Sequence, residues 1–364
     1  MRIIQLVYSL SSGGAEKFVV NLSNELVEMG HEVCICMLLS NQNNQNIFYK
    51  ESLDPRIKIH FFQFSHGFTL GKVRKVCDYI GGYRPDVVHC HLNVIPYIFP
   101  LVIKKSRIRF IHTLHSVAKA ASGTKLQNPI NKFLYRRHWI VPVTISKECS
   151  RTFQEFYAIK TDVLIENGCP QVYPSMEYSQ IKSEFQSYKM NKDSKIFIHV
   201  ARWSPVKNQK LLIDAFNQLD REGKDFVLII VGRGFEDGEG RALRKSACSK
   251  IHFLGEKIHV GDYLLCSDAF CLTSLYEGLP ISLIEAMSCG LTPICTKVGG
   301  IPDVLEDGIT GYLAESGNET DYVNKLKKFM LIPLSSSQIK DVYERKYSMQ
   351  TCVQKYIYLY TSND

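Results

Sequence analysis

The chain has 364 residues, and at the usual size of ~150 residues per domain this length predicts two domains or slightly more. With 45 % apolar and 22 % charged residues it can build ordinary globular cores, and this composition excludes a chain dominated by disorder. There are 44 Lys and Arg against 36 Asp and Glu, which gives a net charge of +8.

The excess of positive charge belongs to the first half of the chain. Residues 1–190 carry 23 basic and 14 acidic side chains, whereas residues 191–364 carry 21 and 22. Within 102–151 there are eleven Lys or Arg and a single acid, Glu148. Such a field favours an anionic partner, either a lipid surface or a phosphate-bearing substrate. Nucleic acid is not expected as a partner, because there is no motif that interleaves aromatic and basic residues.

Three classes of protein are excluded early. The longest apolar stretch, 94–103, has ten residues and two prolines, too short and too broken for a membrane span. The apolar start of the chain is too short for a signal peptide. The twelve cysteines are scattered and form no Cys-x-x-Cys pair, which indicates free thiols in a reducing cytoplasm rather than a disulfide scaffold.

Short apolar runs alternate with amphipathic stretches through the first half. The first expected strand, 3–8, leads through Ser11-Ser12-Gly13-Gly14 into a helix that stops at Gly30. A further helix is expected near 70–80, and further strands at 33–39, 57–62, 86–91, 109–114, 139–145 and 162–165. Strands separated by helices of this length predict a parallel sheet covered on both faces.

The composition changes at 170–191, where polar residues replace the apolar rhythm, and we interpret 169–191 as a linker region. The pattern then restarts, with strands expected at 195–201, 226–231, 252–254, 269–272 and 292–295 and helices at 209–219, 240–247 and 281–289. This predicts two βα domains, at 1–168 and 192–340. A last helix within 341–364 is expected to return toward the first domain.

Two loops at expected strand ends suit an anionic ligand, because open parallel sheets bind ligands at the carboxyl ends of their strands. Gly13 and Gly14 permit a close approach of the backbone, although a simple strand-to-helix turn would look the same. Neither a Gly-x-Gly-x-x-Gly nor a P-loop motif is present. Arg202 and Lys207 pair a guanidinium fork with a point charge and suit a diphosphate; two solvated surface cations are the alternative.

The third loop, 274–287, is the most informative. Pro280 suits a first helical turn and Gly278 the bend before it. Glu277 lies in the loop, where it can hold sugar hydroxyls. Glu285 lies among apolar helix residues, where a carboxylate normally needs a partner such as a ribose diol. For Glu285 a salt-bridged helix residue is the alternative.

The residues from Glu277 to Gly290 read Glu-Gly-Leu-Pro-x-x-Leu-x-Glu-Ala-Met-x-x-Gly. With the following Val298-Gly299-Gly300-Ile301-Pro302-Asp303 they resemble the signature of retaining glycosyltransferases of family four, which have the GT-B fold. Other stretches are similar to the same family over nearly the whole chain: Gly13-Gly14-Ala15-Glu16-Lys17, Thr113-Leu114-His115-Ser116, Val143-Thr144-Ile145-Ser146, Asn167-Gly168, Ala201-Arg202 through Lys207-Asn208, Val231-Gly232-x-Gly234 and Phe253-Leu254-Gly255. Ala201 stands where the family usually has glycine.

The resemblance implies an α/β chain of GT-B fold, with two Rossmann-like domains facing each other across a cleft. It implies that Arg202 and Lys207 neutralise the donor diphosphate as it leaves, that Glu285 binds the ribose and that Glu277 holds the donor sugar. His115 would lie near the sugar and the acceptor oxygen, although its sequence context alone indicates a structural histidine. The resemblance implies further donor contacts at Gly13, Gly14, Gly232, Gly255, Gly278, Leu279, Pro280 and Ile281.

The expected reaction is transfer of a hexosyl-type sugar from a nucleotide diphosphate sugar to a hydroxyl acceptor with retention of configuration. A UDP-sugar is the first choice of donor and a GDP-sugar the second, and no other cofactor is expected. No metal is expected either, because His89 and His91 lack acidic neighbours in sequence and the family generally uses cationic side chains instead. A nucleotide-sugar 2-epimerase and a nucleotide-sugar-binding protein without turnover stay open.

The basic residues of the first half predict a peripheral position on the inner face of the cell membrane. Aromatic residues beside cations suit an anionic bilayer interface, where each basic residue contributes ~1 kcal/mol. The expected acceptor is then a lipid-linked glycan intermediate of cell-surface polysaccharide synthesis, or another saccharide; a solvated basic helix is the alternative reading. The cations expected to face the membrane are Lys104, Lys105, Lys132, Arg136 and Arg137.

Overall fold

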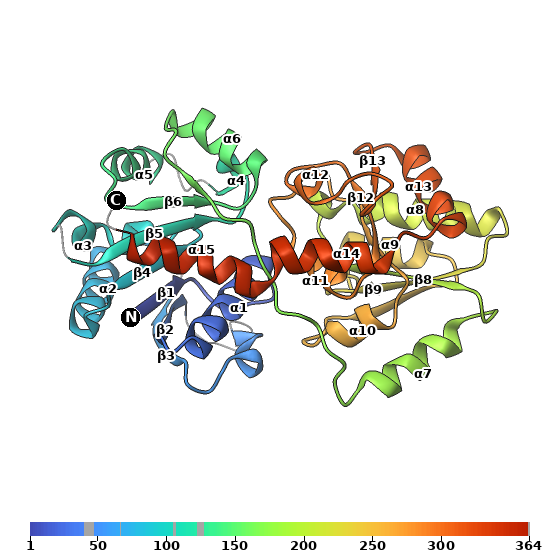
Figure 1. Cartoon of the computed structure of the whole chain (residues 1–364), viewed down its shortest axis with the longest axis horizontal. Coiled ribbons are helices and arrows are strands. Elements are labelled where there is room, and N and C mark those ends of the chain that lie inside the picture. Colours follow the sequence, from blue (N-terminus) through green and yellow to red (C-terminus); the bar gives the residue numbers. More distant parts are fainter. Residues whose placement is uncertain (40–46, 66, 105–106, 122–126, 363–364) are drawn as a thin grey trace. The chain divides into compact units, whose positions relative to one another are not determined.

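The structure, a computed structural model, describes residues 1–39, 47–65, 67–104, 107–121 and 127–362. The chain forms two compact units (Figure 1). Unit 1 contains Met1–Cys169 and the C-terminal segment from Met349 onward, and unit 2 contains Pro170–Ser348. The C-terminal helix therefore belongs to unit 1.

Unit 1 is built on a seven-stranded sheet with the order β3-β2-β1-β4-β5-β6-β7, in which neighbouring strands are parallel. Its strands are β1 (Arg2–Val7), β2 (Glu32–Leu39), β3 (Lys58–Phe64), β4 (Val87–His91), β5 (Arg109–Leu114), β6 (Val141–Thr144) and β7 (Val163–Leu164). Its α-helices are α1 (Gly14–Glu28), α2 (Leu70–Tyr83), α3 (Phe99–Ile103), α4 (Ala118–Ala121), α5 (Gln127–Arg136), α6 (Lys147–Tyr157) and α15 (Met349–Thr361), and two 3₁₀ turns are η2 (Lys50–Ser52) and η3 (Ile95–Tyr97).

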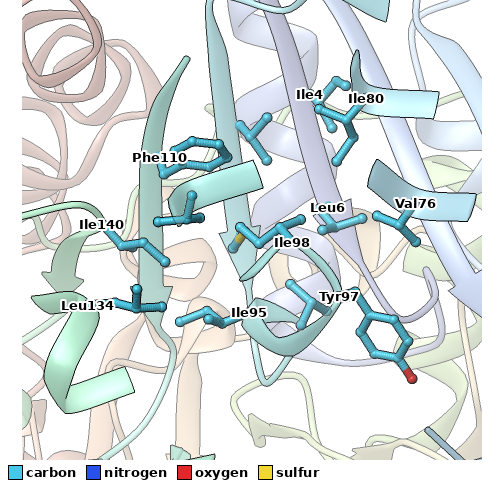
Figure 2. Close-up of a cluster of buried hydrophobic side chains, with 14 of the residues drawn as sticks. Ile4, Leu6, Val76, Ile80, Ile95, Tyr97, Ile98, Phe110, Leu134 and Ile140 are labelled. Atoms are coloured by element: carbon cyan, nitrogen blue, oxygen red, sulfur yellow. The ribbon is translucent and has the colours of Figure 1, made fainter. Parts of the chain in front are cut away.

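Alternation along the strands divides the side chains of this sheet between its two faces. One face carries Ile4 and Leu6 of β1 and packs against Val76 and Ile80 of α2 and against Ile95 of η3, as Figure 2 shows. The opposite face is covered by α1 and α15, which pack against each other. Both faces of the sheet are thus buried, as the run of apolar strands predicts.

Unit 2 is built on a six-stranded sheet with the order β10-β9-β8-β11-β12-β13, again with parallel neighbours. Its strands are β8 (Lys195–Val200), β9 (Phe226–Val231), β10 (Ile251–Gly255), β11 (Ala269–Leu272), β12 (Thr292–Thr296) and β13 (Tyr312–Ala314). Its helices are α7 (Tyr178–Tyr188), η4 (Pro205–Lys207), α8 (Gln209–Arg221), α9 (Gly238–Ser246), α10 (Gly261–Leu265), α11 (Ile281–Ser288), α12 (Ile301–Val304), α13 (Glu319–Leu331), α14 (Ser336–Val342) and a π-turn η5 (Tyr343–Tyr347).

The helices of unit 2 form two groups. Helix α8 packs on α9 and α13, and α10 packs on α7 and α11 (Figure 1). The first group buries Phe216 of α8 and Phe329 of α13 against Phe197 of β8. This is the second parallel α/β sheet that the sequence predicts.

The segment interpreted as a linker region, 169–191, is different in the structure. It contains α7, whose Ile181 and Phe185 are buried, and nearly all of it lies within unit 2. The far boundary also differs, because unit 2 continues past residue 340 to Ser348. In the described part of the chain, we find no helix that is both long enough and apolar enough to cross a membrane.

Candidate functional site

The carboxyl ends of four neighbouring strands of unit 2 bring the predicted donor residues to one edge of the sheet. The loops after these strands are tied to one another through the backbone. The Trp203 N–H after β8 donates to the Arg233 carbonyl after β9 (2.8 Å), and the Gly232 N–H donates to the Gly255 carbonyl of β10 (2.8 Å). After β11, the Leu275 N–H donates to the Val206 carbonyl (2.8 Å). The loops therefore form one connected surface rather than separate flexible segments.

Lys207 and Glu277 lie in direct contact on this surface. The Lys207 Nζ donates to Oε1 of Glu277 at 2.6 Å, and the Ser274 hydroxyl donates to the same oxygen at 2.6 Å. Glu277 is only 8 % exposed. A carboxylate at this depth needs a charged partner and a hydrogen bond, and it has both.

The glutamate loop rests on the second half of the signature, residues 298–303. Gly299 has φ +56°, and a Cβ at this position would lie 1.8 Å from the Glu277 carbonyl oxygen. The Gly300 N–H donates to the Gly278 carbonyl at 2.8 Å. The Thr296 hydroxyl at the end of β12 donates to the Ser274 carbonyl at 2.6 Å. The two parts of the signature are thus one structural element, in which a residue without a side chain lets two loops touch.

Arg202 lies on the same loop as Lys207, between β8 and α8, and borders an open hollow. Its exposed side chain lines this hollow of about 480 Å³, shared with Trp203 and Arg233, whereas neither Lys207 nor Glu277 lines that hollow. Arg233 also lies 3.7 Å from Glu256, at the end of β10. The two predicted diphosphate cations therefore occur on one loop, Arg202 with an exposed side chain and Lys207 with a half-buried one.

The predicted donor residues just before and within helix α11 differ in how far their side chains are buried. The side chains of Leu279, Pro280 and Ile281 are buried, so these residues offer a ligand their backbone rather than their side chains. Glu285, one turn into the helix, is half-buried between buried neighbours. It lies among apolar helix residues, as the sequence pattern indicates.

Sequence reasoning missed His199, which lies on β8 behind this surface. Its Nδ1 lies 2.9 Å from the Cys271 carbonyl oxygen, and because a carbonyl only accepts, Nδ1 carries the hydrogen. Burial and, to a smaller extent, the charge of Lys207 lower the pKa of His199 to about 4. A lone histidine inside an apolar strand pattern carries no sequence signal that distinguishes it from an ordinary core residue.

In unit 1, His115 follows the end of β5 and is half-buried. Its Nε2 lies 2.9 Å from Nδ1 of His91, whose Nε2 lies 2.7 Å from Oε1 of Gln5. The ring of Phe18 packs edge-on against His115 with a centroid separation of 5.5 Å. Burial lowers the pKa of His115 to about 3, so the ring is neutral at physiological pH.

The glycine turn of unit 1 has the expected geometry. Gly13 is extended at the N-terminus of α1, and Gly14 is the first helical residue and is exposed. The carboxylate of Glu16 lies in the first turn and accepts a hydrogen bond from the Ser11 hydroxyl at 3.3 Å.

Helix α5 carries the predicted basic surface. Phe133 is 42 % exposed, and the Arg137 guanidinium lies 5.5 Å from the centre of its ring. Arg136 is exposed and Lys132 half-buried on the same segment. Lys104 is exposed after α3, whereas Lys105 lies outside the described residues.

The apolar stretch 94–103, which adjoins the basic residues in sequence, is folded into unit 1. Val94, Ile95 and Ile98 are fully buried in the core of unit 1. Only Ile103 at its end is an exposed large apolar residue. These side chains pack inside the protein because η3 and α3 lie over the sheet, so they are not available to a bilayer.

No group of three or more metal-ligating side chains that could hold an ion occurs in the described ranges of the chain. His89 and His91, the pair weighed as metal ligands, are both fully buried. His89 instead contacts the hydroxyls of Tyr360 (2.8 Å) and Thr113 (2.7 Å).

Two family models match the chain, one in each unit. Residues 12–169 match the family described as Glycosyltransferase Family 4, and residues 180–346 match the family described as Glycosyl transferases group 1. The two matched segments follow the division into units closely.

Curated relatives and solved structures agree with these matches. The chain is 28 % identical to the N-acetyl-alpha-D-glucosaminyl L-malate synthase of Bacillus anthracis, over 85 % of this chain and 82 % of that protein. It is 24 % identical to the N-acetylgalactosamine-N,N'-diacetylbacillosaminyl-diphospho-undecaprenol 4-alpha-N-acetylgalactosaminyltransferase of Campylobacter jejuni, over 93 % of this chain and 92 % of that protein. The crystal structure of Anabaena HepE with UDP and glucose superposes with a TM-score of 0.81 at 18 % identity and covers 99 % of both chains.

Proposed function

Because this chain belongs to the GT-B glycosyltransferases, with a family 4 half and a group 1 half, we propose that it moves a sugar from a nucleotide diphosphate sugar to a hydroxyl acceptor with retention of configuration. The observation that carries the proposal is the pair of half-buried Lys207 and buried Glu277 at the carboxyl edge of the second sheet. A cation held there by a carboxylate is placed where open α/β sheets bind the phosphates of a nucleotide.

In the proposed mechanism, positive charge stabilises the leaving nucleoside diphosphate. As the glycosidic bond to the donor phosphate breaks, negative charge grows on the phosphate oxygens. Lys207 and Arg202 neutralise this charge, and the hydrogen bond from Lys207 to Glu277 holds the ammonium in place before the donor arrives. Preorganised charge of this kind lowers the barrier because it need not reorient during the reaction.

We assign the sugar and the ribose of the donor to the two glutamates, Glu277 and Glu285. Both hydrogen bonds to Glu277 described above reach Oε1, and we assign its Oε2 to the hydroxyls of the donor sugar. Glu285 accepts hydrogen bonds from the ribose. Gly14 in unit 1 supplies a backbone N–H to the diphosphate, and backbone groups of Gly232, Gly255 and 278–281 complete the donor contacts.

A UDP-sugar is the proposed donor, supported by the UDP and glucose bound in the structure of Anabaena HepE, which shares this fold. Retention is supported by the names of both curated relatives, which specify α-linked products. Retaining transfer from an α-linked nucleotide sugar yields such products.

The proposed acceptor is a lipid-linked glycan intermediate of cell-surface polysaccharide synthesis, presented at the inner face of the membrane. Two observations support it. The Campylobacter jejuni relative is named for an undecaprenol diphosphate acceptor. Helix α5 also exposes Phe133 between Lys132 and the two arginines 136 and 137, a pattern that suits an anionic bilayer surface.

A donor screen tests this function. Purified protein is incubated with UDP-, GDP- and ADP-sugars, with lipid-linked and soluble saccharide acceptors and with or without EDTA, and nucleoside diphosphate release is followed. We expect release from a UDP-sugar that depends on acceptor and survives EDTA, because cationic side chains carry the leaving-group charge. An activity that EDTA abolishes and Mg²⁺ or Mn²⁺ restores would contradict the proposed charge stabilisation, and no release from any donor would contradict turnover.

A further inference from the structure

A row of polar side chains lies in the interior of unit 1, on the sheet face that α1 and α15 cover. Gln5 of β1, His89 and His91 of β4 and Thr113 of β5 are all buried. The parallel registers place Gln5 beside His89 and His91 beside Thr113. Since burying polar groups costs free energy unless they are hydrogen-bonded, this row requires a function or a complete set of partners.

The hydrogen bonds of the row form a directed chain. Gln5 Oε1 lies 2.7 Å from Nε2 of His91, and an amide oxygen can only accept, so His91 Nε2 carries its hydrogen. In a neutral imidazole the other nitrogen, Nδ1, is then an acceptor. That atom lies 2.9 Å from His115 Nε2, which must therefore donate. The remaining nitrogen of a neutral His115, Nδ1, keeps a lone pair.

The surroundings keep these rings uncharged. Burial lowers the pKa of His91 well below the usual value, and burial followed by repulsion from His112 lowers the pKa of His115 to about 3. His89 of β4 lies beside His91, and burial also lowers its pKa; the ring of Tyr356 from α15 packs on His89, and burial raises the pKa of Tyr356. All of these groups are neutral near pH 7, so hydrogen-bond direction alone decides which nitrogen of His115 carries the proton.

We propose that Gln5 and His91 are positioning residues that hold His115 in its neutral Nε2–H tautomer, so that its Nδ1 accepts a hydrogen bond from a hydroxyl group of the substrate. The last step rests on the proposed function. His115 lies at the carboxyl end of β5, where such a sheet binds its ligand, and it is the half-exposed end of a chain whose other members are buried. A ring fixed in this way binds a sugar that presents a hydroxyl more tightly than the deoxy analogue of that sugar.

The tautomer can be observed directly in the full chain without any substrate. Protein labelled with ¹⁵N-histidine is studied by long-range ¹H–¹⁵N correlation, and the His115 signals are assigned through His115→Gln. We expect a neutral His115 with a hydrogen on Nε2 from pH 6 to pH 8. A hydrogen on Nδ1, or a titration within this range, would overturn the proposal.

Two substitutions at Gln5 should move the signal in different ways. Gln5→Leu removes the acceptor, so His115 should become a mixture of tautomers. Gln5→Glu places a carboxylate beside His91 and favours its imidazolium form, whose Nδ1–H then donates to His115 Nε2 and reverses the tautomer. An unchanged His115 spectrum in both folded variants would overturn the proposal.

Tyr356→Phe is the matched control, since it removes a buried hydrogen bond from the same row that ends on Thr113 rather than on Gln5, His91 or His115. It should leave the His115 tautomer unchanged. We expect kcat/KM to fall at least ~10-fold in Gln5→Leu and in Gln5→Glu and to stay near the parent value in Tyr356→Phe. Equal kcat/KM in all variants despite a changed tautomer would overturn the substrate contact, whereas the expected spectra without turnover on any nucleotide sugar would contradict the proposed function instead.

Discussion

At the scale of single residues, the proposed chemistry depends on Lys207. Lys207→Ala should lower turnover by at least ~100-fold, because the loss of a charged hydrogen bond to the leaving group costs roughly 2–4 kcal/mol. Lys210→Ala is the matched control. Lys210 lies three residues after Lys207 and is paired with the carboxylate of Asp214, but its side chain is 72 % exposed. Steady-state kinetics on both variants, with thermal melting to check folding, decide the point. Similar turnover in both would remove Lys207 from the mechanism.

Gly299 provides a second test at this scale. Gly299→Ala should lower both the stability of unit 2 and turnover, because the new Cβ would meet the Glu277 carbonyl at 1.8 Å. Gly317→Ala is the control, since Gly317 has φ +75° but no atom within 4 Å of the added Cβ. It should cost only the ~1 kcal/mol of a left-handed backbone. Melting curves and kinetics that are alike for the two variants would show that contact with the Glu277 loop is unimportant.

The sequence predicts these residues unevenly. Lys207 and Glu277 could be found because their residue types and their place in the signature point to phosphate and sugar chemistry. Ser274 belongs to the same stretch but received no role, since only the fold shows its hydroxyl on the Glu277 carboxylate. Gln5 and His91 could not be found, because their partners lie on other strands, 86 and 24 residues away.

At the scale of elements, helix α5 makes the membrane interpretation testable. Replacing Lys132, Arg136 and Arg137 by Ser should weaken flotation with anionic liposomes, since each basic residue near the surface contributes ~1 kcal/mol. The control replaces three exposed cations of unit 2, Lys224, Arg241 and Lys245. Binding should rise with anionic lipid and fall with salt. Equal binding to neutral and anionic vesicles, or none, would leave α5 as a solvated basic helix.

Secondary structure was predicted best where a short buried run lies between polar loops. Strands β5, β9 and β11 have the expected bounds, because each is a short buried run between polar loops. Helix α7 was missed because only Ile181 and Phe185 of its eleven residues are buried, so its polar composition looks like a linker. The three residues of β13 are too few to show a pattern.

At the scale of the whole molecule, buried neutral histidines predict a loss of stability in acid. Burial lowers the pKa of His112 in unit 1 and of His199 in unit 2 to about 4. Between pH ~6.5 and pH ~4 the unfolded chain binds protons that the folded chain does not, so the free energy of unfolding falls as the pH falls, by up to roughly 3 kcal/mol for each histidine. Above pH ~6.5 these histidines should no longer lower the free energy of unfolding.

The two tryptophans allow this prediction to be checked for each unit, since Trp139 lies in unit 1 and Trp203 in unit 2. Urea unfolding of Trp139→Phe and Trp203→Phe proteins, followed by the fluorescence of the remaining tryptophan, reports one unit at a time. We expect both midpoints to shift to lower urea between pH 7 and pH 5. Midpoints that stay constant would contradict neutral buried histidines.

The central claim is that unit 2 binds a nucleoside diphosphate through Lys207, and calorimetric titration of UDP into the full chain tests it most directly. We expect saturable binding to the parent protein, binding at least ~30-fold weaker in Lys207→Ala, which corresponds to about 2 kcal/mol, and parent-like binding in Lys210→Ala. Equal affinity of the parent protein and Lys207→Ala for UDP, or no binding of UDP, GDP or ADP to the parent protein, would contradict the claim.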